Sequence, residues 1–560
     1  MTGRTAITLY DPLAGEQALG GALEGAERFS KEMASWVPRM GSPDQIVNGA
    51  KDILDARSQD LAQDDALPQA AITTHQDSLV GAKYALNYKP DVATLGVDPE
   101  DPWVEKVQQV VEARWNAMAE SRACWLDASR RRTFSQMCRQ AVASFTMTGE
   151  ILAPVEWLKQ SGRPCRTAVH LISPSRLSNK NNIGDQTYSA DRGYALSRGV
   201  KKDYYGRIIG YQVRRGHPGD MLNRYLMDWD EIDAELPWGR KQMIYVTDPL
   251  LVEQTRGVGD MTPALVHMRM SKKHGQVTLQ NAIVNATYAA AIESDLPPPE
   301  IAIAMGASAS NGGQVQAADV VEGWEGAIGA YMAMVAAYLG GAPNVQIDGA
   351  KMPVLPAGTK FKLMNAGNGG SNFESFQRSI DRKSAAALGM SYEEYTRDYS
   401  QLSYSGGKMS AGKTERFMSG RASVSIAPFA SDVFTLWLEE QFALGAIPLP
   451  PTWASRDDYY QPLMKEAISR CSWIGTGKGQ IDELKETQAA AIRIKNGLST
   501  WEIEGARLGF DWREIAEQQA RERKLFQALG LDSFTQMDAQ KSTQGEGTQQ
   551  TLQGNNNGGE

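Results

Sequence analysis

The chain is poor in the residues that build metal and redox sites. Among 560 residues there are four cysteines and five histidines, and no two cysteines form a C-x-x-C pair. Without a signal peptide at the N-terminus, we expect reduced cysteines packed as small apolar side chains in a cytosolic setting. His267 and His274 lie seven residues apart on one predicted helix face. No third ligand accompanies them, so we predict no metal site.

Long apolar runs and an excess of positive charge are also missing. No stretch of about 18 uninterrupted apolar residues is present, so no membrane span is predicted. The net charge is −8, from 58 basic and 66 acidic residues. No overall basic field therefore draws the chain to nucleic acid, and any DNA contact has to be local or weak. The length is sufficient for two to four domains.

A glycine-rich segment carries the motif that points most directly to catalysis. Residues 407–414 read GKMSAGKT and match the P-loop pattern G-x-x-x-x-G-K-[ST]. A P-loop needs a buried apolar strand before its glycines, so that backbone N–H groups meet the phosphates at the start of the next helix. Residues 393–406 read EEYTRDYSQLSYSG instead, and no strand ending in a magnesium-binding aspartate follows. We expect no nucleotide, cofactor or catalysis, and a P-loop NTPase using Gly407–Thr414 is the alternative.

The hydrophobic pattern predicts an α+β fold. Before residue 300 we expect a helix at 101–120 capped by Asp101, a helix ended by Gly149 and a long helix from 262 to about 294. Short strands are expected between them at 151–157, 167–173, 208–215, 224–229 and 243–247, around a loop at 173–193. After residue 300 we expect a β-α-β insert at 300–365, with strands at 301–305, 345–347 and 359–364 and a helix at 320–339. It is followed by a helix from Asn372 to Gly389, a short helix with the capping box Ser391 and Glu394, a glycine-rich loop, and a helix from near Ser410 to Leu444 kinked at Pro428. Capping boxes at Ser499 with Glu502 and at Asp511 with Glu514 and a disordered tail at 537–560 complete the prediction.

Basic residues are clustered in two places. SRRRTF at 129–134 precedes a helix and is interpreted as a solvated or interface charge cluster. Lys351, Lys360 and Lys362 lie in the insert with few compensating acids, which hints at contact with nucleic acid or an acidic partner.

Four segments together carry a more specific signal than the P-loop letters. They read EQTRGVGDMTPAL (253–265), LGMSYEEYTRDYSQLSYSGGKMSAGKTERF (388–417), IRIKNGLSTWEIEGARLGFDWREIAEQQARE (492–522) and YGRIIGYQVRR (205–215). They resemble the portal proteins of tailed bacteriophages, in particular the lambda family. The chain departs from that family after Tyr-Ser, where small residues are usual, with Gly406, Gly407 and Lys408 and, further on, Gly412 and Lys413. This departure creates the P-loop look-alike.

The resemblance implies a ring-forming portal fold with an α+β wing, a helical stem, a small α/β clip and a helical crown. Its parts would be an N-terminal arm at 1–29, the wing at 30–260 and 410–475, stem helices at 261–295 and 366–389, the clip at 296–365, a channel loop at 390–409, the crown at 476–536 and the tail at 537–560.

The resemblance also implies a function without catalysis. A dodecamer at one capsid vertex would pass double-stranded DNA without sequence specificity, and would contact the terminase large subunit, the major capsid protein and head-completion or tail adaptor proteins. It would assemble in the host cytoplasm and remain in the virion. Tyr404, Lys408 and Lys413 are then candidates for the channel wall, and the three insert lysines for contacts to terminase or DNA. A different ring-forming head–tail adaptor is a further alternative.

Overall fold

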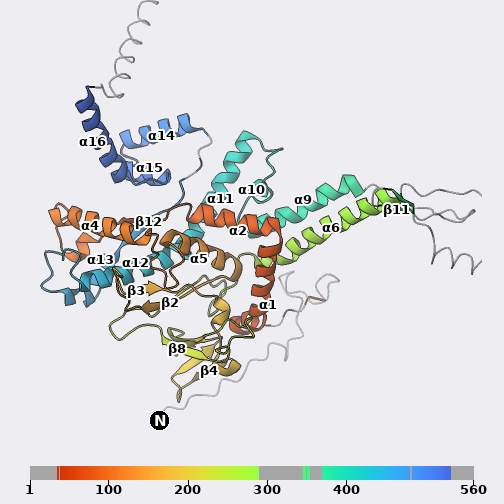
Figure 1. Ribbon diagram of the computed structural model, residues 1–560, viewed down its shortest axis with the longest axis horizontal. Coiled ribbons are helices and arrows are strands. Elements are labelled where there is room, and N and C mark those ends of the chain that lie inside the picture. The colour runs from red at the N-terminus through yellow and green to blue at the C-terminus, as the bar shows by residue number, and fades with distance from the viewer. Residues whose placement is uncertain are drawn as a thin grey trace, which may run out of the picture.

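The computed structural model describes residues 40–288, 345–347, 350–352, 369–477 and 482–530, with isolated positions at 35, 36, 38 and 479. Three parts are visible in Figure 1: a mixed body, a pair of long helices projecting from it, and a group of helices at the C-terminal end. The expected arm at 1–29, the tail at 537–560, Lys360 and Lys362 lie outside the described residues.

The body combines helices with small antiparallel sheets. Its helices are α1 (Pro43–Asp64), α2 (Ala66–Leu79), α3 (Val92–Leu95), α4 (Pro102–Ala119), α5 (Phe134–Thr148), α12 (Ile426–Ala443) and α13 (Met464–Ser469). Its strands are β1 (Ala85–Tyr88), β2 (Glu150–Trp157), β3 (Thr167–Val169), β4 (Gln186–Ser189), β5 (Tyr194–Ser197), β6 (Val200–Lys202), β7 (Ile208–Arg214), β8 (Trp229–Asp233), β9 (Met243–Thr247) and β12 (Cys471–Ile474).

The predicted helices α4 and α5 are confirmed with their caps. The Asp101 carboxylate accepts the N–H of Trp103 at 2.8 Å, and Pro102 occupies the first turn. Gly149 ends α5 in the left-handed conformation, at φ +75°. Helices α1 and α2 were not predicted, because the inward face of α1 buries polar side chains such as Lys51, so its apolar periodicity is weak.

The strands pair antiparallel in the orders β3-β2-β9, β4-β5-β6-β7-β8 and β1-β12. Two expectations in this region are wrong. The segment 173–193 is not all loop, because β4 forms the edge of the five-stranded sheet. Residues 224–227 form turns, and the strand expected at 224–229 begins only at Trp229.

Aromatic side chains from distant segments meet in the core of the body. The ring of Trp115 lies 4.9 Å from Phe134, 5.4 Å from Phe434 and 5.2 Å from Trp437, in edge-to-face orientations between ring centroids. Helix α12 is buried on almost all sides, which matches its run of apolar residues. This core joins α4 and α5 to α12, although Ile426 at the start of α12 follows Thr148 at the end of α5 by 278 residues of sequence.

The projecting pair consists of α6 (Leu265–Tyr288) and α9 (Gly369–Ala387), which lie side by side in Figure 1. A 3-10 turn at Thr262–Ala264 leads into α6. The ring of His274 in α6 stacks on Phe373 in α9 at 4.6 Å. In the insert between them, the structure describes a hairpin of β10 (Val345–Ile347) and β11 (Ala350–Met352). The strand expected at 345–347 is confirmed, and the insert's other expected elements lie outside the described residues.

After α9 come α10 (Tyr392–Thr396) and α11 (Tyr404–Val424). The predicted long helix is broken at Ser425, where α11 meets α12. Pro428 explains this position, because a proline ring clashes with the carbonyl of the residue four positions earlier, here Val424. The kink therefore lies three residues before the proline.

The C-terminal group comprises α14 (Glu483–Lys495), α15 (Trp501–Arg507) and α16 (Trp512–Leu529). Asp511 caps α16 by accepting the N–H of Arg513 at 2.9 Å, so the expected cap is confirmed, but the return bond from Glu514 that a capping box requires is not among the contacts of α16. The cap of α15 is Thr500 rather than Ser499, because the Thr500 hydroxyl accepts the N–H of Ile503 at 3.3 Å. No helix among the described residues is long and apolar enough to cross a membrane.

Candidate functional site

The P-loop match lies inside a helix. The hydroxyl of Ser403 caps α11 by accepting the N–H of Gly406 at 3.2 Å, and the N–H of Gly407 donates to the Ser403 carbonyl at 2.8 Å. The following N–H groups bond along the helix and cannot converge on a phosphate. The expectation of a loop reaching to about Ser410 is wrong, because this cap starts the helix before both glycines.

Thr414 occupies the position that would bind magnesium in a P-loop, but its hydroxyl is buried and already bonded. It donates to Glu394 Oε2 at 2.6 Å. The same oxygen accepts the N–H of Ser391 at 3.1 Å and completes the predicted capping box of α10. Glu394 therefore ties α11 to the start of α10, and the motif residue is structural.

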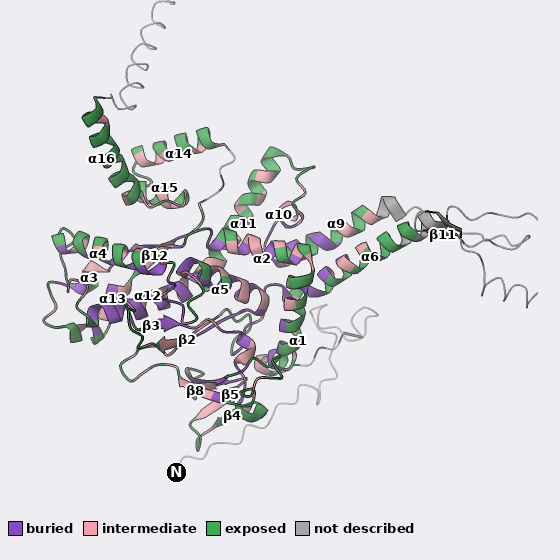
Figure 2. Ribbon diagram, viewed as in Figure 1, coloured by how far each residue is buried: buried purple, intermediate pink, exposed green. Residues whose placement is uncertain are grey.

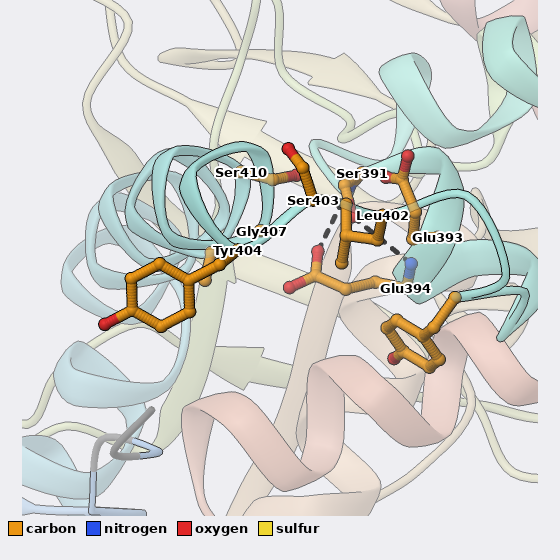
Figure 3. Close-up of a pocket in the computed structure, with 10 residues that line it drawn as sticks. Ser391, Glu393, Glu394, Leu402, Ser403, Tyr404, Gly407 and Ser410 are labelled. Carbon is orange, nitrogen blue, oxygen red and sulfur yellow. Dashed lines mark hydrogen bonds between the residues drawn. The ribbon is translucent and has the colours of Figure 1, made fainter. Parts of the chain in front are cut away.

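A cavity of about 320 Å³ lies between α10 and the start of α11. Figure 3 shows the Glu394 carboxylate directed toward Ser391 on one side of it, while the ring of Tyr404 points away. Glu393 and Glu394 give its lining two carboxylates and no basic side chain. Such a lining repels phosphate, which again argues against a nucleotide at this position.

The root of α6 is fastened to the body by a buried ion pair. Arg256 bonds to Glu150 through two parallel contacts, Nε to Oε1 at 2.7 Å and Nη2 to Oε2 at 2.8 Å, with both side chains at most 1% exposed. The other Arg256 N–H groups donate to the carbonyls of Pro174, Leu177 and Arg198. All polar groups of the arginine are thus satisfied, as burial of a charge requires.

Further groups complete this cluster around Glu150. Tyr245 Oη and the N–H of Gly257 both donate to Glu150 Oε1 at 2.8 Å. Lys51 lies 3.6 Å from Glu150 Oε2 and 2.9 Å from Asp55. Burial raises the pKa of Glu150, but the charges of Arg256 and Lys51 outweigh burial and bring that pKa down to about 2. For Asp55 burial prevails over the charge of Lys51, and its pKa rises to about 6.

Two backbone segments touch at the same place. A Cβ added at Gly257 would lie 2.1 Å from the Gly149 carbonyl oxygen, and one at Gly259 would lie 2.1 Å from the Met147 carbonyl oxygen. This close approach explains the glycines of the RGVG sequence in the segment 253–265. The loop that leads into α6 is therefore held against the end of α5.

Helix α11 is clamped to the same root. Arg421 lies 2.7 Å from Asp248 at the end of β9 and 2.7 Å from Asp260 before α6. Burial raises the pKa of Asp260 to about 6 against the opposing charge of Arg421. The body, the root of the projecting pair and α11 thus meet through one arginine.

The proposed channel residues all lie on α11 and are exposed within a single chain. The charge of Lys408 acts on Asp482 at the start of α14, where, after the Lys485 hydrogen bond, it helps to lower the Asp482 pKa. Lys408 and Lys413 are five residues apart and so face different sides of the helix. Lys351 lies on β11 opposite Gln346.

The sequence interpretation missed Glu150, Arg256 and Arg421. A charged residue placed between a buried strand and glycines, as Arg256 is, was the available signal. His267 and His274, for which we predicted no metal site, both lie on α6, and the ring of His274 stacks on Phe373. Among the described residues, no group of three metal-binding side chains is found.

Comparison with known proteins assigns the chain to a family. The profile described as phage portal protein, lambda family, matches residues 29–421. The chain belongs to the lambda family of phage portal proteins. It is 35% identical over 531 residues to the portal protein of Escherichia phage N15, covering 95% of this chain and 93% of the relative. It is 34% identical over 509 residues to portal protein B of Escherichia phage lambda, covering 90% of each. The resemblance of the four segments is thereby confirmed, and the P-loop alternative gains no support.

More distant likenesses are weaker. A probable portal protein of Halomonas phage phiHAP-1 is 21% identical over 434 residues, covering 76% of this chain and 72% of the relative. Among solved structures, chains from a gene transfer agent virion and from the neck of an empty gene transfer agent particle match with TM-scores of 0.36 and 0.38, at 12% and 11% identity. The first comparison covers 85% of this chain and 94% of the other, and the second covers 81% and 93%.

Proposed function

We propose that this portal-family chain forms a dodecameric ring at one vertex of a phage capsid, through which double-stranded DNA is packaged and ejected. The single observation that carries the proposal is the similarity to two portal proteins over nine-tenths or more of the chain. The ring would contact the terminase large subunit, the major capsid protein and, later, head-completion or tail adaptor proteins. It would assemble in the host cytoplasm and remain in the virion.

The division into parts is also a proposal. The body would be the wing, α6 and α9 the stem, the insert between them the clip, and α14 to α16 the crown. The charge distribution supports a stem that lies along DNA. The two stem helices hold six basic and two acidic residues, although the whole chain carries a net charge of −8. A weakly basic wall attracts the DNA backbone without holding it tightly.

Electron microscopy of the purified chain tests the ring. Particles with a central hole and twelve repeats are expected. A persistent monomer under assembly conditions would contradict the proposal. A ring that joins the capsid to the tail without serving as the channel for DNA packaging would favour a head–tail adaptor instead.

Lys408 and Lys413 are proposed to touch passing DNA in the assembled ring, with Tyr404 beside them on the same helix. Replacing both lysines with alanine should reduce packaged DNA or its retention modestly, because two charges per subunit contribute a small part of phosphate attraction. Replacing Lys106 with alanine is the matched control, an exposed lysine on α4. Normal genome length and titre in the double variant would refute this role.

Nucleotide binding separates the portal from an NTPase. Because the motif is helical and Thr414 is bonded to Glu394, neither the wild-type chain nor Lys413→Ala should bind ATP. Micromolar ATP affinity in the wild type that is lost in the variant would contradict this expectation. Lys408→Ala serves as the control for a general loss of charge.

A further inference from the structure

The crown lacks a core of its own within one chain. Among residues 482–530, Glu504 alone is buried in the described structure, and Figure 2 shows α14 and α16 largely in the colour of exposed residues. Every residue from Glu514 to Leu525 is exposed. Large apolar side chains are exposed throughout the unit: Leu484, Ile492, Leu498, Trp501, Ile503, Leu508, Phe510, Trp512, Ile515, Leu525 and Leu529.

Polar contacts hold this unit to the rest of the chain. Arg513 donates to Gln108 on α4 at 2.7 Å, and Lys89 pairs with Glu502. Arg493 bonds twice to Glu504 and fixes α14 against α15. Exposed contacts of this kind add little stability, and short helices without apolar packing are marginal in water. The crown therefore needs a partner that covers its apolar faces.

Two of those faces have complementary patterns. On α14, Leu484 and Ile492 are eight residues apart and share one exposed side. On α16, Leu525 and Leu529 are four residues apart and form a second exposed stripe. Neither stripe is covered by the described residues of its own chain, and one facing helix can cover a stripe of this kind.

The charges select how these two stripes can meet. Helix α14 begins with Asp482 and Glu483 and ends with Arg493 and Lys495. The first half of α16 carries one basic and two acidic residues, Arg513, Glu514 and Glu517, and its second half carries three basic residues and one acidic residue, Arg521, Glu522, Arg523 and Lys524. An antiparallel contact brings the acidic start of α14 to the basic end of α16, whereas a parallel contact opposes like charges.

We infer that the α14 stripe of one copy packs antiparallel on the α16 stripe of the next copy, so that the crown acquires its core only when the ring closes. The inference rests on the proposed ring, because each copy must offer one stripe to each neighbour. Such a head-to-tail contact between different surfaces is the type that generates closed rings.

Cysteine cross-linking in the full chain tests this contact directly. The double variant Leu484→Cys with Leu525→Cys, treated with a short bismaleimide, should give a ladder of covalent oligomers on a denaturing gel. Each single variant should remain monomeric, because a head-to-tail contact never brings a residue to its own copy. The wild-type chain controls for its four native cysteines.

Images of the same samples distinguish the possible failures. Intact rings without a ladder, or with a cross-link confined to one chain, would overturn the crown contact while leaving the ring itself standing. A dimer band in either single variant would also overturn it. A chain that forms no ring overturns both the contact and the proposed function.

Hydrogen exchange supplies a second measurement with a matched variant. Amides of α14 and α16 should exchange at least about tenfold more slowly in the ring than in the unassembled chain. Ile492→Asp should remove most of that protection in α16. Tyr205→Asp, which changes an exposed tyrosine before β7 and far from the crown, should not. Equal exchange in ring and free chain would refute the inference.

Discussion

Two arginine–glutamate pairs with nearly the same geometry lie in opposite surroundings. At the root of α6, the proposed stem, Arg256 meets Glu150 at 2.7 and 2.8 Å with both side chains at most 1% exposed. In the C-terminal group, the proposed crown, Arg493 meets Glu504 at 2.9 and 2.8 Å with the arginine 37% and the glutamate 9% exposed. The first pair sits in an extensive core, and the second in a unit without one. Geometry alone therefore says little about stability, because the energy of breaking a pair depends on whether water can replace the lost partner.

The electrostatics of the two glutamates make the same point. Both have a pKa lowered to about 2. For Glu504 the main cause is the hydrogen bond from Arg493. For Glu150 burial opposes the shift, and the charges of Arg256 and Lys51 overcome it. Glu150 is ionised because its charged partners outweigh burial, whereas at Glu504 the hydrogen bond from Arg493, which is 37% exposed, is the largest influence on the pKa.

The largest effect is expected from removing the buried arginine. Arg256→Met leaves Glu150 short of its main partner and should destabilise the body by about 3–5 kcal/mol. Arg493→Met should cost under about 1 kcal/mol in the unassembled chain, because Arg493 is partly exposed and Glu504 keeps Arg507 as a partner. Denaturant unfolding measures the loss of stability in each variant, and hydrogen exchange in β2 and α15 shows the loss at each of the two sites. Equal losses at the two sites would show that the contrast in burial has no energetic consequence.

The next largest effect is expected from replacing Gly257, in the loop before α6, with alanine, compared with the same replacement of Gly412 in the P-loop match. Gly257→Ala places a Cβ 2.1 Å from the Gly149 carbonyl oxygen and should destabilise the chain by about 1–3 kcal/mol. Gly412→Ala meets nothing within 4 Å on an exposed helix and should stabilise α11 by about 0.5–1 kcal/mol. Thermal melting of the two variants gives the comparison. If Gly412→Ala were strongly destabilising, the helical assignment of the motif would be wrong.

These two sites also mark how far the sequence alone could lead. Where apolar periodicity and caps agree, as in α4 and α5, the elements were predicted almost to the residue. The sequence also predicts that GKMSAGKT is not a P-loop, because the strand that must precede a P-loop is missing. The cluster around Glu150 was not predicted, because Lys51 and Glu150 are far apart in the sequence and meet only in the folded chain. The polar residues on the buried face of α1 also weaken its apolar periodicity.

The α11 boundary shows a different limit. Two adjacent glycines weaken a helix, and propensity therefore favoured a loop. The Ser403 cap and the buried contacts of Thr414 outweigh that cost in the folded chain. The channel roles of Lys408 and Lys413 stay predictions, because their surroundings depend on neighbouring copies.

The smallest effect concerns pH at the clamp between α11 and the stem root. Burial raises the pKa of Asp260 to about 6, above its value of about 3.9 in an unfolded chain. A raised carboxyl pKa means that the folded state holds its proton longer. Its contribution to stability is therefore full below about pH 4 and is lost as pH rises to about 6.

An asparagine at position 260 cannot ionise, so Asp260→Asn should remove the part of the decline in unfolding free energy that Asp260 causes, on the order of 1 kcal/mol. Arg421 keeps Asp248 as a partner in the variant, which limits other losses. Unfolding free energies at pH 4 and 7 test the difference, with Asp64→Asn, an exposed carboxylate that also pairs with a basic residue of the stem, as the control. A decline between these pH values that is the same in Asp260→Asn and in the wild type would show that the clamp does not titrate in this range.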